Sequence, residues 1–254
     1  MIRIKKVFIP ELPTKEPRRL YVYLPRSYNR SGKRYPVVYM FDGHNVFYDS
    51  HATYGRSWRM KEYLQRSGDE IIIAAIECNP EGNRRLNEYS PWSFDAGEIG
   101  FIEGQGRQTM EWIVNVLKPM IDSSYRTLPE REHTMIAGSS MGGIMSLWAL
   151  VEYNEVFSRA AALSPSLWLE PEKMAEAITS RKLKKPTRVY LDMGGKEAKG
   201  HKRLITTMFE DAKLLADAGA EAAARVVPNA EHNEAAWEKR IPVFMDYLFD
   251  RTDR

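Results

Sequence analysis

Short apolar runs that alternate with longer helical patterns constrain the fold of this chain most strongly. Several of these runs lack polar alternation, which is typical of strands buried on both faces of a mostly parallel sheet. The first two precede any predicted helix and indicate an antiparallel hairpin, whereas the later ones alternate with helices, which predicts an α/β layered fold. The eight predicted strands are residues 2–9, 20–24, 36–42, 71–77, 133–138, 160–163, 188–193 and 223–227.

Apolar residues recur at helical spacing between and after the later strands. Each such stripe predicts a helix that packs against the sheet. Pro242 falls inside the last stripe and predicts a kink or a restart of that helix, and Pro119 raises the same expectation for the helix at 108–121. The stripes are Ile144, Leu147, Trp148 and Val151; Leu204, Ile205, Met208, Ala212 and Leu215; and Trp237, Ile241, Phe244 and Leu248.

Length and composition fit a single domain over residues 1–254. The chain has 37 basic and 34 acidic residues, so its formal charge is only +3 and no nucleic-acid partner is predicted. Neither a run of about 18 apolar residues nor a signal-peptide core occurs. The one cysteine, Cys78, allows no internal disulfide and is expected to be a buried thiol. We therefore expect a cytoplasmic protein with no membrane partner.

Residues 79–105 carry Gly, Pro, Asn and charged side chains without a clear period. A loop of this length inside one domain is usually functional or mobile. We predict that it forms a flap over the active site. Its Arg84 and Arg85 would either contact an anionic substrate or be solvated.

The segment from Gly138 to Gly142 reads Gly-Ser-Ser-Met-Gly and matches the G-x-S-x-G pattern of a nucleophilic serine. A predicted strand precedes it and an amphipathic helix follows it, which is the context that this chemistry requires. The flanking glycines let the chain turn tightly enough to lift the serine hydroxyl out of the sheet. Ser140 is therefore the predicted nucleophile, and Ser139 is displaced from the centre of the glycine frame.

A serine hydroxyl needs a base within hydrogen-bond reach, and that base needs an orienting acid. His232 follows the last predicted strand and is the predicted base. The acid should lie between Ser140 and His232 in the chain, where Glu197 and Asp192 are both candidates. We favour Glu197, since it lies beyond two glycines in the loop after the strand. The other histidines are His44, His51, His133 and His201, of which His133 lies at the wrong end of a strand and His201 is expected at the surface.

An oxyanion hole needs two donors that point at the developing negative charge. The backbone N–H of Met141, next to the nucleophile, is predicted to be one, and the N–H of His44 in the loop after the third strand is predicted to be the other. Gly43 permits the sharp bend in that loop, and Gly43 and Asn45 are predicted to contact substrate. Asp42 and His44 are ligand-type residues two apart, but without a further cluster they predict no metal site.

Trp168 follows the strand after the nucleophile helix, so it either lines the acyl pocket or belongs to the core. Arg85 of the flap completes the predicted substrate contacts.

Several short motifs together resemble the Putative esterase family related to esterase D, which includes siderophore trilactone esterases and feruloyl and acetyl-xylan esterase domains. The motifs are DGHNVF, RLNEYSPW, YRT, GSSMGG, SPSLW and EHNEAAW, and the similarity extends from Arg19 to Leu248. The resemblance implies an α/β-hydrolase fold, with a mostly parallel eight-stranded sheet and helices on both faces, and ester hydrolysis through an acyl-enzyme without a cofactor. It carries over Ser140 and His232, whereas members differ in the carboxylate that serves as the acid.

The leading hypothesis is thus a serine carboxylic ester hydrolase acting on a small-molecule ester, and a catecholate trilactone siderophore is the favoured substrate. An esterase that removes acetyl or feruloyl groups from sugars is the alternative. A non-catalytic binding protein with the hydrolase fold, and an acyltransferase that uses the same three residues, are further hypotheses. No oligomeric state follows from the sequence.

Overall fold

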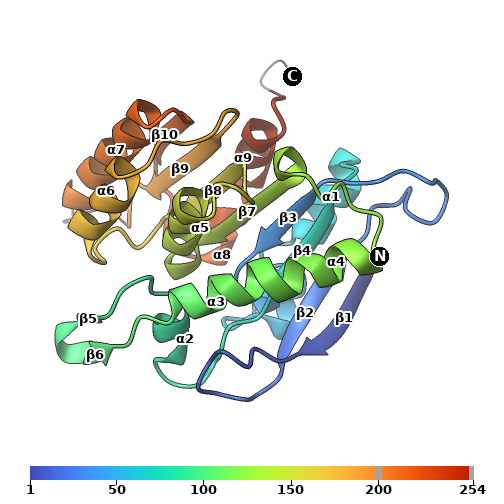
Figure 1. The fold of residues 1–254 in the computed structure, drawn as a ribbon, viewed down its shortest axis with the longest axis horizontal. Coiled ribbons are helices and arrows are strands. Elements are labelled where there is room, and N and C mark those ends of the chain that lie inside the picture. The colour runs from blue at the N-terminus through green and yellow to red at the C-terminus, as the bar shows by residue number, and fades with distance from the viewer. Residues whose placement is uncertain (198, 200–201, 252–254) are drawn as a thin grey trace. The chain divides into compact units, whose positions relative to one another are not determined.

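The computed structural model describes residues 1–197, 199 and 202–251, and its backbone contacts group the chain into two units, Met1–Thr134 and Met135–Arg254 (Figure 1). His201 lies outside the described residues. The single domain expected from the sequence stays a prediction, and each unit is considered by itself.

Four main strands build the N-terminal unit, in the order β1-β2-β4-β3. The first two pair antiparallel, as the predicted hairpin requires, and β4 pairs parallel with β3. Every residue of β3 and β4 is buried, which explains why their sequences lack polar alternation. The strands are β1 (Ile2–Val7), β2 (Arg18–Tyr23), β3 (Val37–Met40) and β4 (Ile72–Ile76).

The helix predicted at 108–121 is continuous but changes its winding ahead of Pro119. Helix α3 (Gly106–Trp112) passes through a π-helical segment, η4 (Ile113–Leu117), into α4 (Lys118–Ser124). Proline has no N–H to donate, so it is tolerated in the first turn of a helix. The π segment ends just before α4, and Pro119 is the second residue of α4. The kink or restart expected at this proline therefore takes the form of a change in helix type.

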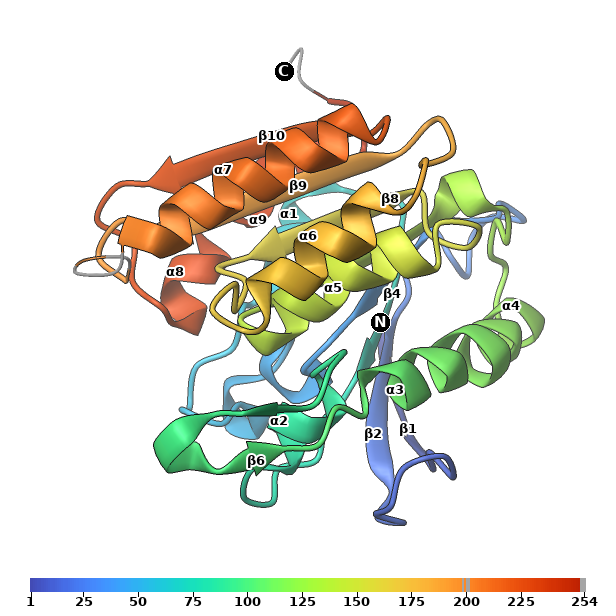
Figure 2. The ribbon, with the colours of Figure 1, turned by 60° about the vertical axis from the view of Figure 1, so that its left-hand side comes forward.

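Residues 79–105 contain more regular structure than the predicted loop. Helix α2 (Arg84–Glu88) and a short hairpin of β5 (Phe94–Asp95) and β6 (Phe101–Ile102) lie within it (Figure 2). A hydrogen bond of 3.2 Å from Asn83 Nδ2 to the Ile99 carbonyl links the two parts. The expectation of a loop without secondary structure was wrong, since elements this short have too few residues to display a period. The remaining elements of the unit are η1 (Gly43–Asn45), η2 (Asp49–His51), α1 (Met60–Ser67), η3 (Gly97–Ile99) and η5 (Arg131–His133).

The C-terminal unit is a parallel sheet in the order β7-β8-β9-β10. Helices α5, α6 and α7 lie on one face of this sheet and α9 packs on β8 and β9 from the other face (Figure 2). Right-handed crossovers between parallel strands place successive helices on one face in this way. The strands are β7 (Thr134–Ser139), β8 (Arg159–Leu163), β9 (Arg188–Gly194) and β10 (Glu221–Val227), and the helices are α5 (Met141–Glu152), α6 (Pro171–Thr179), α7 (Lys202–Asp217), α8 (Glu234–Glu238) and α9 (Ile241–Leu248).

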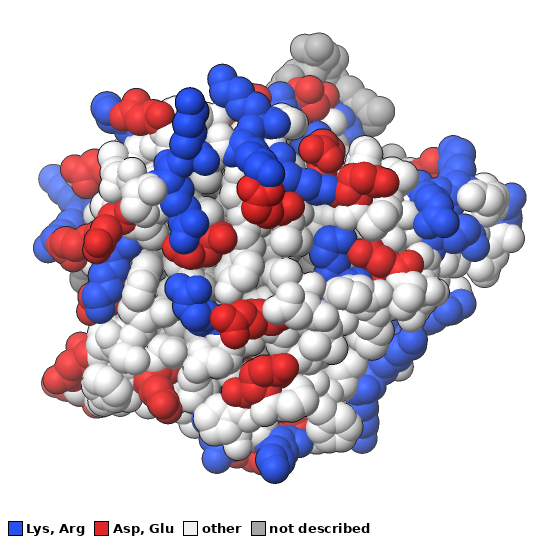
Figure 3. All heavy atoms as spheres, viewed as in Figure 1, with Lys and Arg blue, Asp and Glu red and all other residues white. Residues whose placement is uncertain are grey.

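The last apolar stripe is divided between two helices, as Pro242 predicts. Helix α8 ends at Glu238 and α9 begins at Ile241, with the proline in its first turn. None of the helices in the described ranges is long and apolar enough to cross a membrane. Basic and acidic side chains intermingle on the face seen in Figure 3, as the near-balanced charge of the sequence predicts.

The junction of β7 and α5 is a sharp turn centred on Ser140. Its φ of 57° and ψ of −121° are values that residues other than glycine rarely adopt. The turn brings the backbone of Gly142 against Gly138, where an added Cβ would lie 2.5 Å from the Gly142 carbonyl oxygen. The glycine two residues before the serine is thus a steric requirement of the turn.

We expect Gly138→Ala to lower the free energy of unfolding by about 1–3 kcal/mol, since the methyl group must displace backbone in a closely packed turn. Urea unfolding of the purified protein measures this. Gly32→Ala is the matched control, because an added Cβ at Gly32 meets nothing within 4 Å. Equal stability of the two variants would contradict the steric account of the turn.

Candidate active site

Ser140 is half-buried at the turn and is tied to the loop after β8. Its N–H donates to the Leu163 carbonyl at 2.9 Å, and its own carbonyl accepts the N–H of Ser166 at 3.1 Å. The hydroxyl oxygen lies 3.5 Å from Ser166 Oγ. The backbone around the predicted nucleophile is therefore fixed by the end of β8 and the loop after it, whereas its hydroxyl is only weakly held.

The two other predicted members of a triad, Glu197 and His232, are in direct contact. Glu197 Oε2 lies 2.5 Å from His232 Nδ1. The Glu197 side chain is only 6% exposed, and its second oxygen accepts the Ser164 hydroxyl at 2.6 Å and the N–H of Gly194. Burial alone would raise the pKa of Glu197, but the hydrogen bonds from His232 and Ser164 outweigh it and hold this pKa below its ordinary value.

The His232 ring is half-exposed and stands edge-on against Trp237, with ring centroids 5.0 Å apart. Such an edge-to-face arrangement holds a ring in place without occupying its nitrogens. Nε2 of the imidazole is then available to a reacting group. In the described part of the chain no direct hydrogen bond joins His232 to Ser140. Catalytic hydrogen bonds are often long in a free enzyme and tighten when substrate binds.

Asp192, the other candidate acid, is engaged elsewhere. Its carboxylate is fully buried and accepts hydrogen bonds from Arg240 Nη1 at 2.8 Å and from the Tyr190 hydroxyl at 2.9 Å. Burial raises the pKa of Asp192 despite the nearby guanidinium. Of the two carboxylates that the sequence left open, Glu197 is the one that contacts the histidine.

The loop after β3 is shaped by a close approach to β4. A Cβ at Gly43 would lie 2.5 Å from the Ala75 carbonyl oxygen, so only glycine fits there. His44 is buried, with Nε2 3.0 Å from the Thr53 hydroxyl, and the Asn45 side chain accepts the Thr53 N–H at 2.9 Å. His44 belongs to the N-terminal unit and Met141 to the C-terminal unit, so their shared role as oxyanion donors stays a prediction.

Arg85 holds this same loop from the segment at 79–105. Its Nε and Nη2 donate to the two carboxylate oxygens of Asp42, each at 2.8 Å, and its guanidinium lies 5.4 Å from the centre of the Tyr89 ring. Arg84 is paired with Glu81 at 2.5 Å. Both arginines that the sequence offered for an anionic substrate therefore have partners inside the N-terminal unit.

A possible metal site in the described residues consists of Asp42, His44 and Cys78, whose ligand atoms all lie within 4.8 Å of one another. The sequence pattern did not predict that Cys78 lies beside Asp42 and His44, because Cys78 follows β4 whereas the other two follow β3. The bidentate ion pair with Arg85 takes up both Asp42 oxygens and places a positive charge beside the cluster. That charge disfavours a second cation at this position.

Trp168 lies in the loop after β8 and is an exposed residue, with 47% of its surface accessible. The alternative that it belongs to the core is wrong. An exposed indole close in sequence to Ser166 leaves the acyl-pocket interpretation standing as a prediction.

Two residues that contact the predicted acid were missed at the level of sequence. Ser164 bonds Glu197, and Arg240 bonds Ser164 at 2.8 Å. Ser164 is the first residue after β8, at the same strand end as the nucleophile, and that position could have marked it. Arg240 had no such signal, since an arginine ahead of an apolar helix ordinarily lies at the surface.

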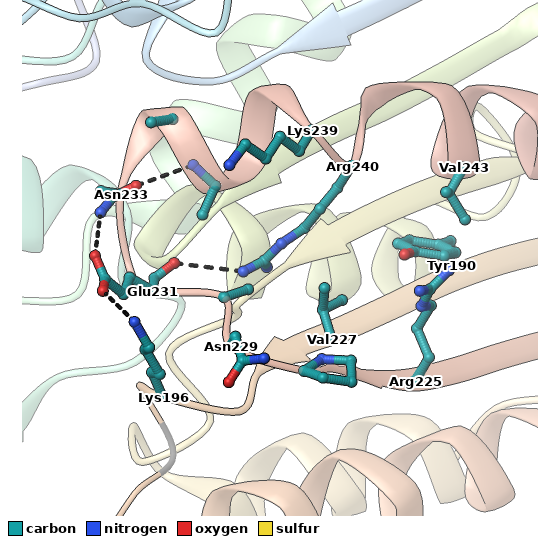
Figure 4. Close-up of a pocket in the computed structure, with 14 residues that line it drawn as sticks. Tyr190, Lys196, Arg225, Val227, Asn229, Glu231, Asn233, Lys239, Arg240 and Val243 are labelled. Carbon is teal, nitrogen blue, oxygen red and sulfur yellow. Dashed lines mark hydrogen bonds and ion pairs between the residues drawn. The ribbon is translucent and has the colours of Figure 1, made fainter.

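A cavity of about 440 Å³ lies beside this cluster, between the end of β10 and the helices α8 and α9 (Figure 4). Arg225, Lys239 and Arg240 are among its lining residues. An ion pair of 3.0 Å from Lys196 to Glu231 crosses one side of it and links the residue before Glu197 to the residue before His232 (Figure 4). Arg240 thus faces the cavity on one side and the candidate triad on the other.

Comparisons with known proteins extend over most of the chain. YbbA of Bacillus subtilis, an uncharacterised protein, is 29% identical over 201 residues, which cover 78% of this chain and 76% of that protein. The crystal structure of an IroE-like serine hydrolase from Shewanella oneidensis aligns with a TM-score of 0.78 and 22% identity, over 98% of this chain and 79% of the other. Siderophore hydrolase EstB from Aspergillus nidulans aligns with a TM-score of 0.72 and 17% identity, over 100% and 96%.

The structural similarity establishes a shared fold and confirms the predicted α/β-hydrolase architecture. The family model described as "Putative esterase" matches residues 13–246. The resemblance inferred from the motifs is confirmed, and the chain belongs to the Putative esterase family.

Proposed function

We propose that this esterase is a serine carboxylic ester hydrolase in which Ser140, His232 and Glu197 form the catalytic triad. The observation that carries the proposal is the contact of 2.5 Å between Glu197 and His232, in the same unit as the strained turn of Ser140. A buried carboxylate on Nδ1 holds the imidazole in the tautomer whose Nε2 can accept a proton.

The chemistry follows from these roles. Ser140 Oγ attacks the ester carbonyl while His232 Nε2 takes its proton, and the tetrahedral intermediate collapses when His232 returns that proton to the leaving alcohol. Water then attacks the acyl-enzyme with His232 again as base, which releases the acid and restores the serine hydroxyl. The backbone N–H of Met141, the residue after the nucleophile, would stabilise the oxyanion in both steps.

For the substrate we propose a catecholate trilactone siderophore. Support comes from the fold shared with a protein described as a siderophore hydrolase. The arginines at 84 and 85 do not add to this support, because each already has an acidic partner. The alternative substrate is an acetyl or feruloyl sugar ester, and a comparison of kcat/KM values distinguishes the two.

Ser140→Ala and His232→Ala should each reduce kcat for an activated aryl ester by about 10⁴-fold or more, since nucleophile and base act as one unit. Steady-state hydrolysis measures this. Ser139→Ala is the matched control, because Ser139 is a neighbouring buried serine outside the proposed triad, and it should keep most of the activity. Near-wild-type turnover by the Ser140 or His232 variant would refute the triad.

Glu197→Gln and Asp192→Asn should separate catalysis from stability. The first should lower kcat by about 10³-fold or more through loss of the orienting carboxylate, with little change in stability. The second should cost about 3 kcal/mol in unfolding free energy, because it leaves the buried Arg240 without its charge partner, and should lower kcat much less. Activity assays and urea unfolding on both variants test this pair. The reverse pattern would reassign the acid to Asp192.

The substrate proposal is tested by kcat/KM for a catecholate trilactone and for a feruloyl or acetyl sugar ester, with Ser140→Ala as the blank. A preference for the trilactone of about 100-fold or more is expected, equivalent to about 2.7 kcal/mol of transition-state binding. A preference for the sugar ester would move the function to carbohydrate de-esterification and leave the triad intact.

A further inference from the structure

The Ser164 hydroxyl is hydrogen-bonded to three side chains, which together fix its orientation. It accepts hydrogen bonds from Arg240 Nη1 at 2.8 Å and from Trp237 Nε1 at 3.1 Å. A hydroxyl has two acceptor lone pairs and one proton. Both lone pairs are therefore filled by groups that can only donate, and the proton must point to the remaining neighbour, Glu197 Oε1, at 2.6 Å.

These hydrogen bonds restrict which oxygen of Glu197 can carry a proton. Oε1 accepts the Ser164 proton and the N–H of Gly194, so both of its hydrogen-bond partners among the described residues are donors. A proton placed on Oε1 would have no acceptor. The only remaining proton position lies on the other side of the carboxylate, between Oε2 and His232 Nδ1.

The charge of Arg240 determines whether this proton resides on Glu197 Oε2 or on His232 Nδ1. Its Nη2 lies 3.5 Å from Glu197 Oε1, and its side chain is only 3% exposed. A positive charge this close and this deeply buried favours the ionised carboxylate, which leaves the proton on His232 Nδ1. Nε2 of His232 then carries the lone pair that the proposed reaction requires.

We propose that Arg240 is a positioning residue which, through Ser164, keeps Glu197 a pure hydrogen-bond acceptor and thereby fixes the His232 tautomer. This inference rests on the proposed triad. It also gives Asp192 a role, since this buried carboxylate balances the charge of Arg240 and leaves Nη1 pointing at Ser164.

In the part of the chain that the structure describes, the charged and titratable groups around Glu197 come from three elements. Loop residues supply His232 and the ion pair of Lys196 with Glu231, β9 supplies Asp192 and Tyr190, and the N-terminus of α9 supplies Arg240. Two of these groups carry a positive charge, Lys196 and Arg240. Lys196 is paired with Glu231 farther from the carboxylate, so Arg240 supplies the positive charge next to Glu197. Its removal should make proton uptake by the Glu197–His232 pair easier.

Arg240→Gln tests this, because glutamine keeps a donor for Ser164 and removes the charge. We expect kcat to fall about tenfold with KM near the wild-type value. The acid limb of the kcat/KM profile should move to higher pH by about one unit, as expected when a nearby opposite charge is lost. A role limited to stability would lower the melting temperature without moving this limb.

Arg188→Gln is the matched control. Arg188 is another partly buried arginine of the same unit, 16% exposed and paired with Glu221 and Asp250, and it makes no contact with the candidate triad. Its variant should keep the wild-type acid limb even if it is less stable.

A folded Arg240→Gln variant with the wild-type pH profile would overturn the proposal. If that variant does not fold, Ser164→Ala decides, because it removes the proton donor to Glu197 and no charge. It should lower kcat about tenfold at unchanged KM and weaken the downfield proton NMR signal of the His232 Nδ1–H. Wild-type kcat and signal in Ser164→Ala would equally overturn the proposal. Loss of activity in Ser140→Ala tests the triad separately, so the two failures are distinguishable.

Discussion

The sharp turn between β7 and α5 is the constraint on which the proposed chemistry depends. The approach of the Gly142 backbone leaves no room for a side chain at Gly138, and Ser140 adopts a positive φ of 57° with a ψ of −121°. That conformation turns the Ser140 hydroxyl away from the buried strand and places it at the start of a 12-residue helix. Hydrogen bonds from the turn to Leu163 and Ser166 then hold it to the neighbouring strand. Strain of this kind persists only where surrounding contacts determine the backbone.

The acid and base reach the same region because of strand order. Ser140 follows β7, Ser164 follows β8, Glu197 follows β9 and His232 follows β10, and all four strands are parallel. Parallel strands end at one edge of a sheet, so side chains far apart in sequence meet there. Arg240 and Asp192 form a buried ion pair next to these strand ends, in which each neutralises the charge of the other. A buried ion pair contributes little net stability, which suits a role in orientation.

Sequence reasoning succeeded where a local pattern decides the structure. The eight predicted strands match eight strands of the described residues, and Pro242 marks a helix restart, because burial and proline geometry act within a few residues. The helix and hairpin within residues 79–105 were not predicted, since they are too short for a period and depend on contacts such as Asn83 with Ile99. Chain order alone could not choose between Asp192 and Glu197. Arg240 was missed because its partner Asp192 lies 48 residues away in the chain.

Covalent labelling of the nucleophile tests the central claim most directly. The protein would be treated with one equivalent of an aryl organophosphonate, digested, and the modified peptide sequenced by mass spectrometry. The account predicts a single adduct on Ser140 that is lost in Glu197→Gln or His232→Ala at the same reaction time, because the hydroxyl reacts only when its base is oriented. An adduct on Ser139 or Ser166, or no adduct at all, would contradict it.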